Sequence, residues 1–260
     1  MISFPPVRPI SPHFGEQGHV FGVLLAVPNL FAQSLLATVP VANYPQAIAM
    51  NPFTNRVYAL EEPANQITEI DGTTNSATTF SLGVNSQKSL NGAIAINSFT
   101  NKIYIVDGVN NHLSVLNGAT RAVAQVTVGN APVAVAVNLY TNTIYVVNEF
   151  DNTVTVVNGS MLGTTTVNVG VEPLAIAIDL DRNKIYVADF GSNAVTVIDG
   201  RTNSTASIPV GSSPVALAMN RGTHNVYVAD RLANTVTVIS SAGAVTGTVP
   251  VGSVPVANRH

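Results

Sequence analysis

Five oxygen-bearing side chains occupy the same place in a recurring pattern, three residues after a tyrosine. They are Glu61, Asp107, Asn148, Asp189 and Asp230. If the copies surround a common axis, these carboxylate and amide oxygens converge, and a hard cation such as calcium takes oxygen ligands. The alternative is that each side chain caps its own turn and points away from the axis. We favour turn capping, because repetition in every copy is what a fold requirement produces. We therefore expect no cofactor, and a calcium-like divalent cation is the alternative.

The residues beside this set differ from copy to copy, which is a property of loops that recognise a ligand. Most of these neighbours are acidic or aromatic, and one is a cation. Together with the repeated set they give the candidate binding residues Glu61, Glu62, Asp107, Asn148, Glu149, Phe150, Asp189, Phe190, Asp230, Arg231 and Leu232.

The sequence contains no recognisable catalytic machinery. It has no Gly-x-Ser-x-Gly elbow, no His-Glu-x-x-His helix and no glycine-rich phosphate loop. Its five histidines are scattered, and His112 and His224 replace Thr and Asn at turn positions of the repeat. Without paired ligands at metal spacing, we expect both to be surface turn residues. No catalytic residue is therefore predicted.

The elements that would hold these residues come from an internal repeat. Tyr58, Tyr104, Tyr145, Tyr186 and Tyr227 are separated by 46, 41, 41 and 41 residues. Each period holds four runs rich in β-branched residues and closed by Asn, Asp, Gly or Pro, as in "VAVAV", "TIYVV", "TVTVV" and "TTTVNV". A period of about 40 to 45 residues with four strands is typical of a propeller blade. The predicted fold class is all-β, a β-propeller of four-stranded antiparallel blades.

The chain divides into a leader, residues 1–34, and a propeller, residues 35–260. The repeats cover approximately 45–90, 91–131, 132–172, 173–213 and 214–254, and a further repeat starts at 255–260. Because "LLATVPV" resembles an outer strand and the last residues resemble the start of another copy, we expect five blades of a six- or seven-bladed ring. Unpaired strand edges on the two end blades predict self-association.

The repeated tyrosines and asparagines are interpreted as structural. We expect each Tyr to pack between blades with its hydroxyl bonded at the edge. The Asn before each third strand is expected to adopt a left-handed turn conformation and to bond its own backbone two residues on. These asparagines are Asn65, Asn111, Asn152, Asn193 and Asn234. The variable loops after the second strands would then lie at the mouth of the propeller channel.

Composition limits the partners. Charged residues make up 10% of the 260 residues, the formal net charge is -3, and the 11 Lys and Arg are spread along the chain. No basic stripe is available to bind a phosphate backbone, so we expect no nucleic-acid partner. The absence of cysteine excludes disulfides and thiolate chemistry.

The N-terminal segment predicts export. "HVFGVLLAV" contains an apolar stretch of about eight residues, too short to span a bilayer but suited to a signal peptide. Small residues follow at Ala32-Gln33-Ser34, which places the mature N-terminus near Leu35. We expect a periplasmic, extracellular or cell-surface protein with no transmembrane segment in the mature chain. The alternative is that residues 20–27 form an ordinary buried strand.

The pattern Pro-x-Ala-x-Ala-x-Asn, then Thr-Asn-x-Ile-Tyr-Val, then Asn-Thr-Val-Thr-Val-Ile-Asp-Gly resembles the YVTN β-propeller repeat family, also described as YncE-like or surface-layer-type propellers. The resemblance covers residues 37–260 and is strongest in the third to fifth copies. It implies an exported or cell-surface repeat protein. It supplies no catalytic residues, because the repeated positions are structural. The rings of this family often hold seven blades, more than the five copies found here.

Three functions are compatible with these features. The first is a secreted or surface-attached scaffold that binds a protein or a cell-envelope or extracellular ligand through the variable loops. The second is an enzyme of the lactonase or lyase type, with a metal or polar site at the channel mouth. The third is an architectural module of a surface coat or adhesin. We favour the scaffold, because the blades are regular and no catalytic set is recognisable.

Overall fold

The structure is a computed structural model, and it describes residues 37–42, 45–61, 66–83 and 93–255. The chain divides into two units, Met1–Leu36 and Ala37–His260, and the fold described here belongs to the second. The predicted leader and the predicted residues Glu62 and Asn65 lie outside the described residues.

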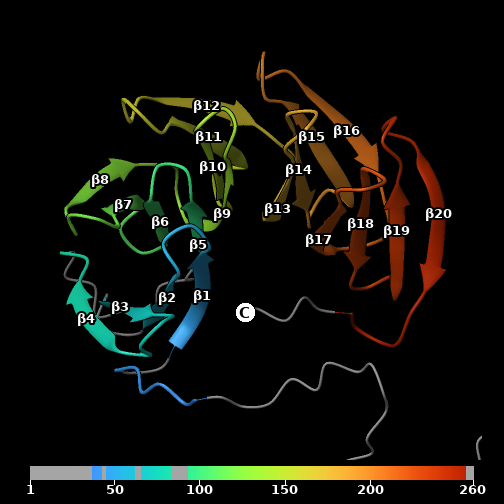
Figure 1. Cartoon of the computed structure of the whole chain (residues 1–260). Helices are drawn as coiled ribbons and strands as arrows, with labels where there is room; N and C mark the ends of the chain where they lie inside the picture. The colour runs from blue at the N-terminus through green and yellow to red at the C-terminus, as the bar shows by residue number, and fades with distance from the viewer. Residues whose placement is uncertain (1–36, 43–44, 62–65, 84–92, 256–260) are drawn as a thin grey trace, which may run out of the picture. The chain divides into compact units, whose positions relative to one another are not determined.

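The described residues form five four-stranded antiparallel sheets, each with its strands in chain order (Figure 1). The predicted all-β fold of four-stranded blades is confirmed. Blade 1 comprises β1 (Pro45–Asn51), β2 (Arg56–Glu61), β3 (Gln66–Asp71) and β4 (Ala77–Ser81). Blade 2 comprises β5 (Ile94–Asn97), β6 (Lys102–Asp107), β7 (His112–Asn117) and β8 (Val123–Thr127). Blade 3 comprises β9 (Pro132–Asn138), β10 (Thr143–Asn148), β11 (Thr153–Asn158) and β12 (Thr164–Asn168). Blade 4 comprises β13 (Pro173–Asp179), β14 (Lys184–Asp189), β15 (Ala194–Asp199) and β16 (Thr205–Pro209). Blade 5 comprises β17 (Pro214–Asn220), β18 (Asn225–Asp230), β19 (Thr235–Ile239) and β20 (Val245–Pro250).

The first strands hold neighbouring blades together. β1 contacts β5, β5 contacts β9, β9 contacts β13, and β13 contacts β17. Figure 1 shows these strands on the inner side of the five sheets and the fourth strands on the outer side. Small residues such as Ala175 and Ala177 alternate along β13, which lets the inner strands approach closely. Nowhere in the described ranges is there a helix long and apolar enough to cross a membrane.

In blades 1 to 4, a tyrosine on the second strand fills the space between that blade and the next. Tyr145 is fully buried and belongs to one core cluster with Val147 of its own blade and with Ile185 and Val187 of the next. Burial raises the pKa of Tyr145 to about 12. The predicted packing between blades is therefore confirmed for this residue.

The predicted edge hydrogen bond of the tyrosines is wrong for Tyr145, whose buried hydroxyl finds no hydrogen-bond partner among the described residues. The hydroxyls of Tyr58 and Tyr104 are buried too, but Glu69 interacts with the first and Thr100 with the second, and each affects the pKa of its tyrosine. Apolar side chains of the next blade surround all three rings.

The asparagines before the third strands adopt the left-handed conformation that the sequence predicts. The φ angles of Asn111, Asn152, Asn193 and Asn234 lie between 53° and 57°. Their side chains, however, do not bond their own backbone two residues on. The side chain of Asn152 accepts a hydrogen bond of 2.8 Å from the N–H of Glu172, on the segment that leaves the blade. These asparagines therefore tie blades 2 to 5 each to the segment that follows the blade.

Among the described residues, the first and fifth blades each leave one face without a neighbouring blade. Tyr227 of blade 5 is 37% exposed, whereas Tyr145 is 0% exposed. On blade 1, Ile48 and Met50 are 60% and 58% exposed. In the described part of the chain, β17 and β1 do not pack against each other as extensively as the first strands of consecutive blades do. Each open face carries the side chains that, in the other blades, form one half of a junction between consecutive blades.

We expect copies of the chain to associate through these open faces, because burying the same apolar side chains stabilises the internal junctions. Ile48→Asp and Tyr227→Asp should each weaken this association, whereas Phe150→Asp, at an exposed turn remote from both faces, should not. Sedimentation velocity over a concentration series measures the effect. A chain that stays monomeric at every concentration would contradict the prediction.

Replacing Tyr145 separates the role of its ring from that of its hydroxyl. Tyr145→Phe should change the free energy of unfolding by less than about 1 kcal/mol, because the buried hydroxyl has no partner to lose. Tyr145→Ala should cost roughly 3 to 5 kcal/mol, because it opens a cavity between blades 3 and 4. Urea unfolding measures both. A large loss in Tyr145→Phe would show that the hydroxyl is hydrogen-bonded.

Candidate functional site

Each blade has two ends, which carry different loops. We call the turns between first and second strands the hairpin rim, residues 52–55, 98–101, 139–142, 180–183 and 221–224. We call the turns between second and third strands, with the segments that join the blades, the connector rim. In blade 4, Asp179 pairs with Lys184 at the hairpin rim and Pro173 pairs with Asp189 at the connector rim.

The repeated oxygen-bearing residues lie at the connector rim and are buried. Glu61, Asp107, Asn148, Asp189 and Asp230 are at most 1% exposed. Asp107 accepts hydrogen bonds from the N–H groups of Val109 and Asn110, as the turn-capping interpretation states. Asp107 therefore caps the turn of its own blade.

The other members of the set bond chiefly to the third strand. Asp189 Oδ2 accepts a hydrogen bond of 2.6 Å from Thr196, and Asp230 Oδ2 accepts one of 2.6 Å from Thr237. The amide of Asn148 donates to the hydroxyls of Thr153 and Thr155, and Glu61 accepts from Thr68 and from the N–H of Ala42. Within the described ranges, none of these acids belongs to a group of three or more His, Asp or Glu side chains that are close enough together to hold a metal ion. A calcium-like cation at this rim stays a prediction.

The variable residues of the connector rim are mostly exposed. Phe150 and Leu232 are 68% and 66% exposed. Arg231 is exposed, while Glu149 and Phe190 are half-buried. The hollow described next is lined by none of these five side chains.

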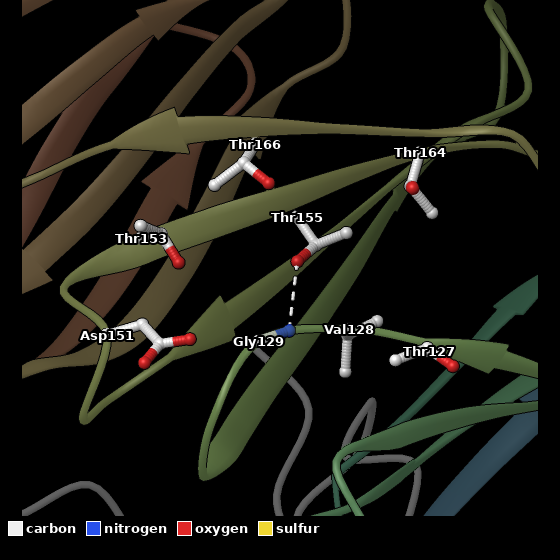
Figure 2. A pocket seen from close by; sticks show the side chains of 8 residues that line it. All are labelled: Thr127, Val128, Gly129, Asp151, Thr153, Thr155, Thr164 and Thr166. Atoms are coloured by element: carbon white, nitrogen blue, oxygen red, sulfur yellow. Dashed lines mark hydrogen bonds between the residues drawn. The ribbon is translucent and has the colours of Figure 1, made fainter.

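A hollow of about 390 Å³ lies between blades 2 and 3, and Figure 2 shows the side chains that line it. The lining residues are Thr127, Val128, Gly129, Asp151, Thr153, Thr155, Thr164 and Thr166. The N–H of Gly129 donates to Thr155 Oγ1 at 3.3 Å, and a Cβ at Gly129 would stand 2.6 Å from the amide of Asn148. The one carboxylate of the lining, Asp151, accepts from the N–H of Asn130. The hollow therefore holds several hydroxyl groups and one exposed carboxylate, and its lining includes no histidine.

The hairpin rim carries a hydrogen bond that repeats at each blade junction. The amide of Asn138, the last residue of β9, donates at 2.7 Å to Asn183 in the turn of the next blade. Asn51 and Asn97 make the same bond to Asn101 and Asn142. The accepting turn residue has a φ near +50°, which Asn tolerates better than most residues.

Blade 5 replaces this amide pair with a histidine and a carboxylate. His224 Nδ1 lies 3.0 Å from Asp179 Oδ2 and 3.2 Å from Oδ1, so the ring N–H donates to the carboxylate. The side chain of Asp179 is 2% exposed and that of His224 is 22% exposed. With Nδ1 protonated, Nε2 carries the free lone pair. A buried carboxylate that orients an accessible histidine is the arrangement of a general base and its orienting partner.

Two arginines and a second carboxylate surround this pair. Arg182 Nη1 lies 3.4 Å from Asp179 Oδ2, and Arg221 Nη2 lies 4.0 Å from Asp181 Oδ1. One ligand atom each from Asp179, Asp181 and His224 lie within 4.8 Å of one another, a spacing that could hold a metal ion. Both carboxylates already have an arginine partner, so the group is balanced in charge without a cation.

Three exposed aromatic rings continue along the same rim. Phe53, Phe99 and Tyr140 occupy the same turn position in blades 1, 2 and 3. The ring centroids of Phe53 and Phe99 are 5.4 Å apart, and those of Phe99 and Tyr140 are 6.4 Å apart. Arg221 Nη2 donates to the hydroxyl of Tyr140 at 3.4 Å, which links the aromatic row to the histidine cluster. The hairpin rim is therefore the candidate active site.

The residues predicted to form a site lie at the other rim. His224 is predicted to be a surface turn residue, and it does lie in a turn with a φ of 56°. The signal for the hairpin rim is that Asp179 and His224 break the Asn pattern together. A further signal was Ser241, which stands where the other blades have Gly72, Gly118, Gly159 or Gly200 against the turn asparagine. His112, the other histidine assigned to a turn, begins strand β7 and is half-buried.

Comparison with known proteins supports the fold. No family model matches the sequence, and no curated protein matches it. A solved streptogramin B lyase matches with a TM-score of 0.68 and 14% identity, covering 80% of this chain and 69% of its own. Virginiamycin B lyase from Staphylococcus aureus matches with a TM-score of 0.70 and 15% identity, covering 81% and 71%. A functionally unknown protein from Desulfotomaculum acetoxidans matches with a TM-score of 0.66 and 14% identity, covering 80% and 70%.

These neighbours correct the functional expectation. We expected a binding scaffold without catalysis, but two of the neighbours are named as lyases, so the enzyme alternative is the better supported one. At 14% and 15% identity the likeness itself shows the β-propeller fold and carries over no residue. The expectation failed because it rested on the absence of catalytic sequence motifs, whereas the candidate base and its partner come from different blades.

Burial of the acids at the connector rim predicts how stability depends on pH. Burial raises the pKa of Asp189 to about 6, although hydrogen bonds from Thr196 and from the N–H of Gly170 oppose it. The folded state therefore holds a proton between about pH 4 and 6 that the unfolded state has lost, so stability falls as the pH rises through this window. Burial also raises the pKa of Asp230, so its contribution to the pH dependence of stability has the same sign.

We expect Asp189→Asn to stabilise the protein at pH 7.5 and to change little at pH 4. The upper bound is about 3 kcal/mol, for a pKa difference of about two units. Blade 3 already has Asn148 at this position, so the amide fits. Urea unfolding at both pH values measures the effect. Asp71→Asn is the control, because N–H donors of Thr73 and Thr74 lower the pKa of Asp71 and its pH dependence has the opposite sign. Equal pH profiles for Asp189→Asn and the wild type would contradict the prediction.

Proposed function

We propose that this protein is an enzyme of the lyase type, with His224 as the general base of a site on the hairpin rim. The observation that carries the proposal is the His224–Asp179 pair, which replaces the amide pair found at the other blade junctions. Two structural neighbours that are named as lyases support it.

The geometry suits an elimination. Nε2 of His224 would take a proton from a carbon next to a carbonyl group. The electron pair of that C–H bond forms a carbon–carbon double bond, and the bond to the leaving oxygen breaks, with the oxygen keeping its pair. Asp179 stabilises the imidazolium that forms. Arg221, whose side chain is 60% exposed, can donate to the carbonyl oxygen as negative charge develops there.

We further propose that the chain is an exported propeller of the YVTN type. The 41-residue period and the motif that recurs in copies three to five support the family, and the apolar stretch before Ala32 supports export. Mass spectrometry of the protein purified from its host tests the second point, since an intact N-terminus on cytoplasmic protein would contradict export.

The activity test uses virginiamycin B, the compound in the name of one neighbour. We expect the wild type to cleave it without incorporation of oxygen from labelled water, because elimination consumes no water. Asp179→Asn and a triple variant, Asp179→Asn, His224→Asn and Ser241→Gly, should each reduce kcat/KM by roughly 10²- to 10⁴-fold. Mass spectrometry of the products measures both the rate and the oxygen content.

The triple variant is designed to keep the fold. It rebuilds at blade 5 the amide pair of Asn138 and Asn183, and Ser241→Gly restores the glycine that the turn asparagine requires, since a Cβ at Gly200 would lie 2.3 Å from Asn183 Oδ1. Its thermal midpoint should match that of the wild type. No cleavage by the wild type, cleavage by the triple variant at the wild-type rate, or solvent oxygen in the product would each contradict the proposal.

A further inference from the structure

The aromatic row on the hairpin rim is not required by the fold. Phe53, Phe99 and Tyr140 follow an asparagine whose side chain accepts their backbone N–H. Gly222 occupies the same position in blade 5, and its N–H makes the same bond to Asn220 at 2.9 Å. The turn therefore forms without an aromatic side chain, and the three rings need another explanation.

The rings are exposed although each is large and apolar. Phe53, Phe99 and Tyr140 are 66%, 57% and 59% exposed, and they contact one another in sequence across three blades. Contiguous exposed apolar surface on a soluble protein marks a place where a partner or ligand binds. The planes of neighbouring rings are inclined by only 37° and 25°, so the row presents similarly oriented rings to a ligand.

The polar residues at the end of the row determine which polar group of a ligand can bind there. Tyr140 meets Arg221, and beyond it lie Asp181 and the His224–Asp179 pair. Arg182 and Arg221 balance Asp179 and Asp181 in charge, so this end offers donors without a net positive field. A neutral carbonyl oxygen is the acceptor that suits such a donor, because an anion would meet Asp181 beside the arginine.

We propose that the aromatic row and Arg221 bind the substrate, and that the substrate class is an uncharged compound with a flat aromatic group attached to an ester or amide carbonyl. This inference rests on the proposed function, because it places the carbonyl beside His224. Stacking of the aromatic group on Phe99 and its neighbours positions the compound, and Arg221 donates a hydrogen bond to the carbonyl oxygen.

Binding of 2-naphthamide, a fluorescent compound of this class, tests the inference. Fluorescence anisotropy should show binding to the wild type and at least tenfold weaker binding to Phe99→Ser. Phe150→Ser is the matched control, since Phe150 is 68% exposed on a turn of the connector rim, and it should bind within twofold of the wild type. Arg221→Gln should weaken 2-naphthamide binding several-fold.

Three further ligands make the class falsifiable. 2-Naphthoate carries a negative charge, cyclohexanecarboxamide lacks the aromatic ring, and maltohexaose is a saccharide, so each should bind at least tenfold more weakly than 2-naphthamide. Stronger binding of any of them that depends on Phe99 would overturn the substrate class. Equal binding of 2-naphthamide to Phe99→Ser and Phe150→Ser would overturn the site.

The outcome can be separated from that of the proposed function. The triple variant that removes His224 and Asp179 should bind 2-naphthamide within twofold of the wild type while losing catalysis. Loss of catalysis in the triple variant with unchanged turnover in Phe99→Ser would overturn only the inference about the aromatic row. Binding that depends on Phe99, in a protein whose triple variant keeps wild-type turnover, would overturn only the role of His224.

Discussion

The hydrogen bond between adjacent blades at the hairpin rim is the interaction on which the rest of the structure depends. It joins the last residue of one first strand to a left-handed turn residue of the next blade, as Asn138 joins Asn183 at 2.7 Å. Because it fixes the distance between inner strands, it also fixes the space that Tyr145 fills farther out. The same bond sets the spacing of the turns, and therefore of every side chain that the rim displays. Packing and candidate site thus share one geometric cause.

Much of the fold could be predicted because its determinants are local or periodic. Each strand is a short run of β-branched residues, and the turn that ends it contains Asn or Gly, so the four-strand blade follows from one repeat. Recurrence of Tyr58 and its equivalents indicates a ring packed between blades. The partners of polar side chains could not be predicted in this way. Asn152 bonds to Glu172 and not to its own turn, because the blade brings the connector back to that turn.

The candidate site was missed for a related reason. Asp179 and His224 are 45 residues apart, so a single position in either copy shows only a conservative exchange of Asn for Asp or His. Positions 179 and 224 are the two partners of one inter-blade hydrogen bond. Comparing them shows that both partners are exchanged together. Phe53, Phe99 and Tyr140 were overlooked because an aromatic residue in a turn is ordinary by itself. Their mutual contact depends on the curvature that brings consecutive turns together.

The exchange at the junction of blades 4 and 5 carries a cost that the fold alone does not require. An amide pair satisfies the junction without charge, as the bonds of Asn51, Asn97 and Asn138 show. The carboxylate of Asp179 is almost wholly buried, and it needs both His224 and Arg182 to offset the loss of water. This junction departs from the pattern that the other junctions follow, and charged groups compensate for the change. Departures of this kind are most often found at functional sites. Among the described blade junctions, the one between blades 4 and 5 lacks the neutral amide pair that satisfies the others, and this departure from the repeat marks it as the functional junction.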